Sequence, residues 1–155
     1  LDEVDAIVLN TTNEVIVKSR TPRYAASSCF GRCEQLATGK TATIDELSQK
    51  ILTEHLKPLA AAGIAAPGRF FAMIRAHDIE ADTMELGDHF DFSTNPFAQG
   101  PHDIIFITGK DAVKCATHPE LKNDPRLWVV NLEMHLDRYL FDSLEEVLKA
   151  KRSMH

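Results

Sequence analysis

From Thr43 onward, short apolar strands alternate with amphipathic helices, and this alternation restricts the chain to few architectures. The clearest strand is "IIFI" at residues 104–107, followed at once by "TGKDAVK", where a short helix is expected from Asp111. A strand that is apolar on both faces must be covered on both faces, as in a parallel sheet with helices on each side. The sequence therefore predicts an α/β fold with a mostly parallel sheet.

The first two helices are marked by capping residues and by periodicity. Thr43 and Glu46 have the spacing of a capping box, in which the two side chains accept hydrogen bonds from backbone amides that have no partner in the first turn of a helix. Pro67 suits the first turn of a second helix, "GRFFAMIRAHD". The apolar residues expected on the inner faces of these helices are Ile44, Leu47, Ile51, Leu52, Leu56 and Leu59 in the first, and Phe70, Phe71 and Ile74 in the second.

Three further strands complete the alternation. They are "AAAGIA" at residues 60–65, "EADTMEL" at 80–86 and "LWVVNLEM" at 127–134, and a loop covers residues 87–101. A second capping box, from Ser143 to Glu146, predicts a last helix that ends near Lys151. Helices are therefore expected on both faces of the sheet, in an α/β/α arrangement.

The first 42 residues differ in character. The chain begins at Leu1 and enters a buried-strand pattern at Val4–Asn10, and "EVIVKS" at 14–19 is a second strand candidate. Residues 20–43 show no helical period and indicate a linker with an irregular hairpin around "FGRCEQLATGKTAT". Because a lone strand cannot cover its own faces, we expect a fragment of a longer chain. Residues 1–42 would be the end of a preceding domain plus a two-stranded linker, and residues 43–155 the α/β/α domain.

Charge and composition argue against several partners. The net charge is −6 and the isoelectric point about 5.6, whereas a nucleic-acid partner needs a basic stripe. The uncharged stretch at residues 58–68 is too short to cross a bilayer. Cys29, Cys33 and Cys115 lack the spacing of a zinc site, so we expect free thiols in a reducing cytoplasm and no metal site.

Two segments imitate a phosphate-binding loop. Gly39-Lys40-Thr41 matches the end of GxxxxGK[ST], but Glu34 stands at the position of the first glycine. Gly109 and Lys110 follow a strong strand, but Asp111 stands where a Ser or Thr must hold magnesium. Neither segment is expected to cradle a nucleotide.

Taken together, "DAIVLN", "LATGK", "GIAAPGRFF", "LGDHFDF" and "ITGKDAVKC" resemble the C-terminal half of tetraacyldisaccharide 4'-kinase, the lipid A 4'-kinase. The family pattern there is an Asp-Ala-Val-Val-Val-Asn-like strand, a Gly-Ile-Gly-x-Pro-x-Arg-Phe-Phe turn, an Asp-His pair and Thr-Glu-Lys-Asp-Ala-Val-Lys. Order and spacing match from Asp5 to the strand near Trp128. The sequence departs from the pattern at Ala65, where the family has glycine, and at Gly109, where it has glutamate.

The resemblance implies a kinase that moves the γ-phosphoryl group of ATP to the 4'-hydroxyl of a tetraacylated glucosamine disaccharide in lipid A biosynthesis. It implies ATP and Mg²⁺ as cofactors, both bound mainly by an N-terminal P-loop domain that this sequence lacks, with the site between two α/β/α domains. The full-length protein would contact the cytoplasmic face of a Gram-negative inner membrane peripherally. This fragment would be soluble and inactive alone, although a closing domain can be essential for phosphoryl transfer, which depends on positioning.

Candidate site residues follow from the rule that ligands bind at the carboxyl ends of parallel strands, here 63–69, 87–91 and 108–114. The resemblance makes His89 the catalytic candidate, since it matches the family histidine that pairs with an aspartate from the other half. Without the resemblance, a histidine that pins a surface loop is the commoner interpretation. The substrate-binding candidates are Asn10, Asp88, Arg69, Lys110 and Asp111.

Plainer interpretations of these candidates remain open. Asn10 is also a common turn former, Asp88 can brace the loop of His89, and an arginine such as Arg69 in a first helical turn is often only solvated. Residues 108–114 can be a strand-to-helix turn held by local polar contacts, in which a glycine allows a sharp exit and Asp111 caps the helix.

Two other classes of function also remain open. One is a stand-alone flavodoxin-like α/β module that binds a ligand, which a complete sheet without the strand at residues 1–13 would favour. The other is a domain without catalysis that docks to a kinase.

Overall fold

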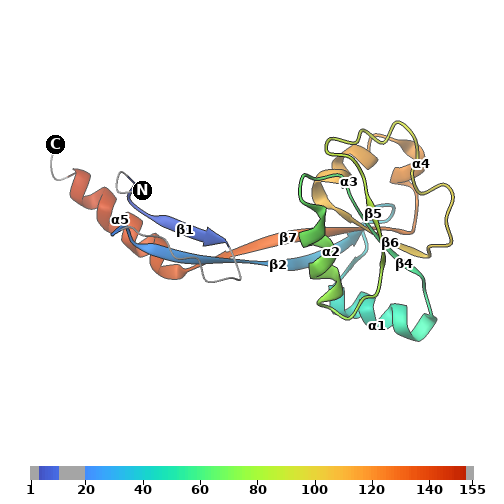
Figure 1. Cartoon of the computed structure of the whole chain (residues 1–155), viewed down its shortest axis with the longest axis horizontal. Helices are drawn as coiled ribbons and strands as arrows, with labels where there is room; N and C mark the ends of the chain where they lie inside the picture. The colour runs from blue at the N-terminus through green and yellow to red at the C-terminus, as the bar shows by residue number, and fades with distance from the viewer. Residues whose placement is uncertain (1–3, 11–19, 153–155) are drawn as a thin grey trace. The chain divides into compact units, whose positions relative to one another are not determined.

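A computed structural model of the chain describes residues 4–10 and 20–152 (Figure 1). The fold divides into two compact units, one drawn from Leu1–Cys29 and Glu133–His155 (unit 1) and the other formed by Phe30–Leu132 (unit 2). Hydrogen-bonded neighbours in the sheet follow the order β1-β2-β7-β6-β4-β5, and β3 pairs with β2. The strands are β1 (Ile7–Asn10), β2 (Arg23–Gln35), β3 (Thr41–Ala42), β4 (Pro58–Ala62), β5 (Asp82–Glu85), β6 (Ile104–Thr108) and β7 (Leu127–Leu136).

The centre of unit 2 is a parallel sheet. β6 lies between β4 and β7, with Phe106 paired to Ala60 on one side and to Trp128 on the other. β5 joins the free side of β4, also in parallel. β2 pairs antiparallel with β3, and the pairs β1–β2, β4–β5, β4–β6 and β6–β7 are parallel, so the sheet is mixed but mostly parallel, as predicted.

Helices cover both faces of this sheet (Figure 1). Ile104 and Phe106 of β6 pack in a buried cluster with α1 and α2, whereas Ile105 and Ile107 pack on the opposite face with α3, α4 and the loop after β5. This alternation explains why β6 is apolar at every position. The predicted α/β fold with helices on both faces is confirmed; the helices are α1 (Ile44–Glu54), α2 (Pro67–Arg75), α3 (Gly109–Cys115) and α4 (Pro119–Lys122), and α5 (Arg138–Arg152) belongs to unit 1.

The capping box of the first helix is confirmed, but its predicted apolar face was too long. Thr43 Oγ1 accepts from the Glu46 amide at 3.1 Å, and a Glu46 carboxylate oxygen accepts from the Thr43 amide at 2.6 Å. The helix ends at His55, which adopts a left-handed conformation with φ of 52°. Leu59 therefore belongs to β4, and Leu52, one position beyond the buried stripe, is 56% exposed.

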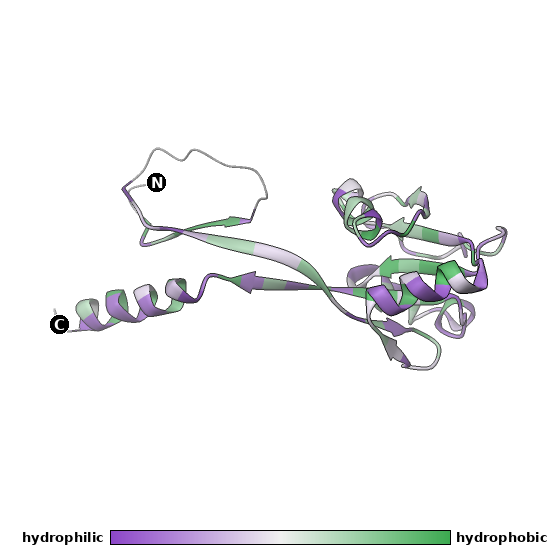
Figure 2. Ribbon diagram, turned by 90° about the horizontal axis from the view of Figure 1, so that it is seen from below, coloured by the Kyte–Doolittle hydropathy of each residue, from purple (hydrophilic) through white to green (hydrophobic). Residues whose placement is uncertain are grey.

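The capping box predicted for the last helix is wrong. Helix α5 begins at Arg138, so Ser143 lies inside it. Asp137 stands at the helix start, where its carboxylate accepts from the Tyr139 amide at 3.0 Å. The helix thus starts from a cap six residues before the predicted one. Figure 2 shows hydrophobic and hydrophilic residues alternating along α5, the helix that leads to the C-terminus.

In the described part of the N-terminal region, the first strand is shorter than its sequence indicated, and the second, β2, is a strand of 13 residues where a linker was expected. The strand expected at Val4–Asn10 is confined to β1, which pairs in parallel with β2, and the candidate at residues 14–19 lies outside the described residues. The predicted hairpin is present, since β2 turns into β3 through a bond from the Gln35 amide to the Lys40 carbonyl at 2.8 Å. No helix in the described part of the chain is both long and apolar enough to cross a membrane.

Candidate functional site

Three predicted segments meet at one edge of the parallel sheet in unit 2. Strands β4, β5 and β6 run in the same direction, so their carboxyl ends lie at a common edge. The chain continues from these ends into residues 63–66, 87–91 and 108–111. Hydrogen bonds from α3 join the segment after β6 to the other two segments.

Asp111 connects the segment after β6 to the segment after β4. Its side chain is fully buried, and its Oδ2 accepts from the Gly63 amide at 3.1 Å and from Thr108 Oγ1 at 2.6 Å. Thr108, not Asp111, is the N-cap of α3, since its hydroxyl oxygen accepts from the Asp111 amide at 3.2 Å. The expectation that Asp111 caps this helix is therefore corrected; its carboxylate instead joins two strand ends.

Gly63 sits where all three segments approach closely. A β-carbon at this position would lie 2.9 Å from Asp111 Oδ1, and 3.5 Å from both the Gly87 carbonyl oxygen and the Phe90 β-carbon. The first distance is shorter than real β-carbon contacts, so any larger residue would displace the Asp111 side chain. Asp111 Oδ1 is buried and has no hydrogen-bond partner within the described part of the protein.

Gly109 does not use the backbone freedom expected of it. It is the first residue of α3, and its φ is not in the left-handed region, so no special backbone freedom is used there. A β-carbon would lie 3.2 Å from Asn131 Oδ1 on β7. This contact is tight, but the exposed Asn131 side chain would have to shift by only a few tenths of an ångström to relieve it.

His89 lies on the loop after β5 and is held there by its neighbours. Lys114 of α3 donates from Nζ to the Phe90 carbonyl oxygen at 2.8 Å, and the Phe90 amide donates to the Gly87 carbonyl oxygen at 2.9 Å. The Phe90 ring packs edge-on against the buried ring of Phe92, with centroids 5.0 Å apart. These contacts fix the residue that follows His89 on both its backbone and its side chain.

The imidazole of His89 points away from the core. Its side chain is 78% exposed and its φ is 63°, a left-handed conformation that histidine adopts at a cost. Asp88 accepts from the His89 amide at 3.1 Å, while its carboxylate is 3.7 Å from His89 Nε2, too long for a hydrogen bond. Asp88 thus braces the backbone of the loop, and the imidazole makes no hydrogen bond to another described residue.

The remaining candidates occupy two places. Arg69 and Lys110 are exposed and stand in the first turns of α2 and α3, two helices that start at the same sheet edge as the loop of His89. Asn10 ends β1 in unit 1, where its Oδ1 accepts from Ser28 Oγ at 3.4 Å. The two cations and His89 therefore belong to one edge of the sheet in unit 2, whereas Asn10 belongs to unit 1.

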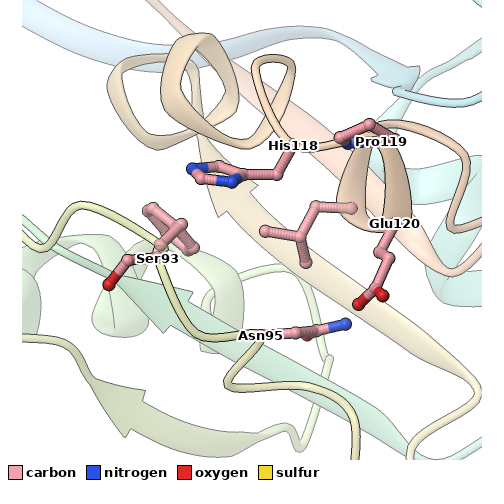
Figure 3. A pocket seen from close by; sticks show the side chains of 7 residues that line it. Ser93, Asn95, His118, Pro119 and Glu120 are labelled. Carbon is pink, nitrogen blue, oxygen red and sulfur yellow. The ribbon is translucent and has the colours of Figure 1, made fainter.

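A pocket of about 380 Å³ was not expected from the sequence (Figure 3). It lies between the loop after β5 and the short helix α4, and its lining includes the buried Leu121 and the polar side chains of Asn95 and Glu120. His118, which starts α4, contacts the Asp91 carbonyl oxygen at 3.2 Å. None of the predicted site residues lines this pocket, and the one sequence signal for it was Pro119, which suits the first turn of a helix.

The chain is similar to known proteins in sequence and in structure. The family model described as Tetraacyldisaccharide-1-P 4'-kinase matches residues 1–149. The tetraacyldisaccharide 4'-kinase of Herminiimonas arsenicoxydans is 52% identical over 92 residues, which are 59% of this chain and 26% of that protein. That of Janthinobacterium sp. (strain Marseille) is 48% identical over 93 residues, 60% of this chain and 27% of that protein.

A solved structure shares the fold. The crystal structure of the "apo" form of LpxK from Aquifex aeolicus in complex with ATP matches with a TM-score of 0.63 and 19% identity, over 94% of this chain and 43% of that chain. The chain thus spans about a quarter of the length of the curated relatives it matches. Because the family model covers nearly all of its residues, the chain belongs to the tetraacyldisaccharide-1-P 4'-kinase family.

Proposed function

We propose that this chain is the C-terminal part of a tetraacyldisaccharide 4'-kinase. The complete protein would transfer the γ-phosphoryl group of ATP to the 4'-hydroxyl of a tetraacylated glucosamine disaccharide in lipid A biosynthesis. The observation that carries the proposal is the family match over residues 1–149. The names of both curated relatives, and the ATP in the Aquifex aeolicus crystal structure, support the reaction and the phosphoryl donor.

ATP and Mg²⁺ are assigned mainly to an N-terminal P-loop domain, because the described residues of this chain do not fit a phosphate cradle. Gly39 turns the β2–β3 hairpin with φ of 70°, and Thr41 pairs with Glu34 in that hairpin, so a strand and not a helix comes directly after this glycine. At the start of α3, the carboxylate of Asp111 is buried next to the first turn and would oppose a phosphate there. This chain alone is therefore expected to be inactive.

In this proposal His89 is the residue that the chain contributes to catalysis. A carboxylate from the preceding domain would orient the 4'-hydroxyl and take up its proton as transfer proceeds. An imidazole within hydrogen-bond reach would hold that carboxylate in place, and the exposed, backbone-braced loop of His89 suits such a contact. The left-handed conformation of His89 is the kind of local strain found at functional sites.

The other candidates would act on the substrate. Arg69 and Lys110 place positive charge at the same sheet edge as His89, where phosphate groups of the lipid or the nucleotide would be attracted. Asp88 and Asn10 would contribute polar contacts, and Asp111, which is buried, would act only through the loops it joins. The full-length protein would meet its lipid at the cytoplasmic face of the inner membrane.

The test is steady-state phosphorylation of the disaccharide lipid by the full-length protein. His89→Ala should lower kcat by roughly 10²-fold or more, the low end for an acid–base group, with ATP affinity and melting temperature nearly unchanged. Asp88→Asn should cost less, because it keeps an acceptor for the His89 amide. His55→Asn, which replaces another left-handed histidine at the end of α1, is the matched control. Normal turnover in His89→Ala would refute this role.

A further inference from the structure

Cys29, Glu133 and His135 bring three metal-binding groups together in unit 1. The Cys29 sulfur, a Glu133 carboxylate oxygen and a His135 ring nitrogen all lie within 4.8 Å of one another. Cys29 is on β2 and the other two are on β7, its hydrogen-bonded neighbour in the sheet (Figure 1). Glu133 and His135 are two positions apart on one strand, so their side chains share a face.

No other interaction accounts for this grouping. Across residues 4–10 and 20–152, none of the three side chains has a hydrogen bond or an ion pair, although the groups are close. Cys29 is also the accessible thiol. Burial raises the pKa of Cys33 to about 11 and that of Cys115 to about 12, and both side chains are fully buried, whereas Cys29 is half-buried.

The donor set selects the class of ion. Thiolate, imidazole and carboxylate together are ligands of Zn²⁺, while Mg²⁺ prefers oxygen ligands alone. Zinc bonds of about 2.0–2.3 Å in a tetrahedron put neighbouring ligand atoms about 3.5 Å apart. Glu133 and His135 are exposed, so rotation of their side chains can close the remaining distance of about 1 Å. One thiolate and one carboxylate balance the two charges of the ion, and the thiol proton leaves to solvent.

We propose that Cys29, Glu133 and His135 form a zinc site that clamps β2 to β7. Three protein ligands leave a fourth position for water. The site is independent of the proposed kinase chemistry, because it lies in unit 1 and uses none of the residues assigned to phosphoryl transfer. Sequence spacing did not indicate it, since the cysteine and the other two ligands come from strands far apart in the chain.

The site can be tested on the 155-residue chain, treated with EDTA and kept reduced. Calorimetry with ZnCl₂ should show one saturable equivalent, unaffected by millimolar Mg²⁺. Co²⁺ used as a probe should give a thiolate-to-cobalt charge-transfer band in the near ultraviolet. Cys29→Ser and His135→Gln should each weaken Zn²⁺ binding by about 100-fold or more, since even the loss of an outer partner costs 10–100-fold. Circular dichroism should show both variants folded, because neither side chain is part of the core.

Matched measurements separate this site from adventitious binding. His55→Asn removes an exposed histidine outside the cluster and should bind Zn²⁺ like the parent chain. Zn²⁺ should raise the melting temperature of the parent and of His55→Asn but not of Cys29→Ser. The proposal is overturned if Co²⁺ binds without the charge-transfer band, if Cys29→Ser binds Zn²⁺ as the parent does, or if bound Zn²⁺ leaves the melting temperature unchanged.

Discussion

Replacing Asp111 by alanine should destabilise unit 2 more than any other change to a charged residue at the sheet edge. The substitution leaves the buried Gly63 amide without its acceptor, which costs about 1–3 kcal/mol, and removes the bond from the Thr108 hydroxyl, worth about 1 kcal/mol. The variant no longer has to bury a carboxylate, and this gain in stability offsets part of the loss. The small cavity that alanine leaves increases the loss. The expected loss is about 3 kcal/mol, a large share of the about 5–15 kcal/mol that holds a typical protein folded.

Trp128 provides the assay for Asp111→Ala. It is the only tryptophan in the sequence, and it is buried in the core of unit 2, so its fluorescence reports unfolding of that unit. A loss of about 3 kcal/mol should lower the melting temperature by roughly 6–12 °C for a chain of this size. Asp111→Asn, which keeps an oxygen for the Gly63 amide, should lie between the parent and the alanine variant.

Asp88→Ala is the matched control for Asp111→Ala. Asp88 is an aspartate at the same sheet edge, but its side chain is 47% exposed and it braces only its own loop. Its loss should change stability by less than about 0.5 kcal/mol. If Asp111→Ala and Asp88→Ala have the same melting temperature, the hydrogen bond from the Gly63 amide to Asp111 does not stabilise the protein. The structural reasoning for residues 108–111 is then wrong.

Two further predictions concern the thiols and the loop of His89. At pH 8 a thiol reagent should label Cys29 alone, because pKa values of about 11 for Cys33 and about 12 for Cys115 leave at most about one molecule in a thousand as reactive thiolate. In denaturant all three cysteines should react. Fast labelling of Cys115 in the folded chain would contradict its burial. In the full-length protein, Lys114→Met should lower kcat by roughly tenfold while KM for ATP stays constant. The reason is that the Phe90 carbonyl loses the hydrogen bond from Lys114, which holds the loop of His89. A change in stability without a change in kcat would show that the contact only supports the fold.

The fold was predictable where the signal lies within a few residues. The apolar run of β6 indicates a strand covered on both sides, and the two faces of that strand do pack against different helices. The capping box at Thr43 is equally local, since both of its bonds join residues three apart. Such local patterns predict the structure correctly because no contact with a distant residue competes with them.

The sequence predictions were wrong where two local patterns compete for one helix start, or where a residue distant in the sequence determines the local structure. Ser143 has the sequence of a cap, but Asp137 comes first and starts the helix as soon as β7 ends. Gly109 has the sequence of a flexible turn, but it is the first residue of α3 and its φ is not in the left-handed region. The same limit hid the cluster of Cys29 with two residues of β7, since only strand pairing brings them together.

The segment "TGKDAVK" shows how local and distant requirements combine at the candidate site. Thr108 caps α3, and the cap sets the direction in which the helix leaves the sheet. One helical turn then presents Asp111 to the segment after β4 and Lys114 to the segment after β5. Residues three apart on a helix lie on neighbouring positions of one face, so a single short helix can hold two loops at once. The motif therefore needs an aspartate and a lysine at this spacing to hold the loop of His89 in place. Neither side chain has to touch a substrate for this.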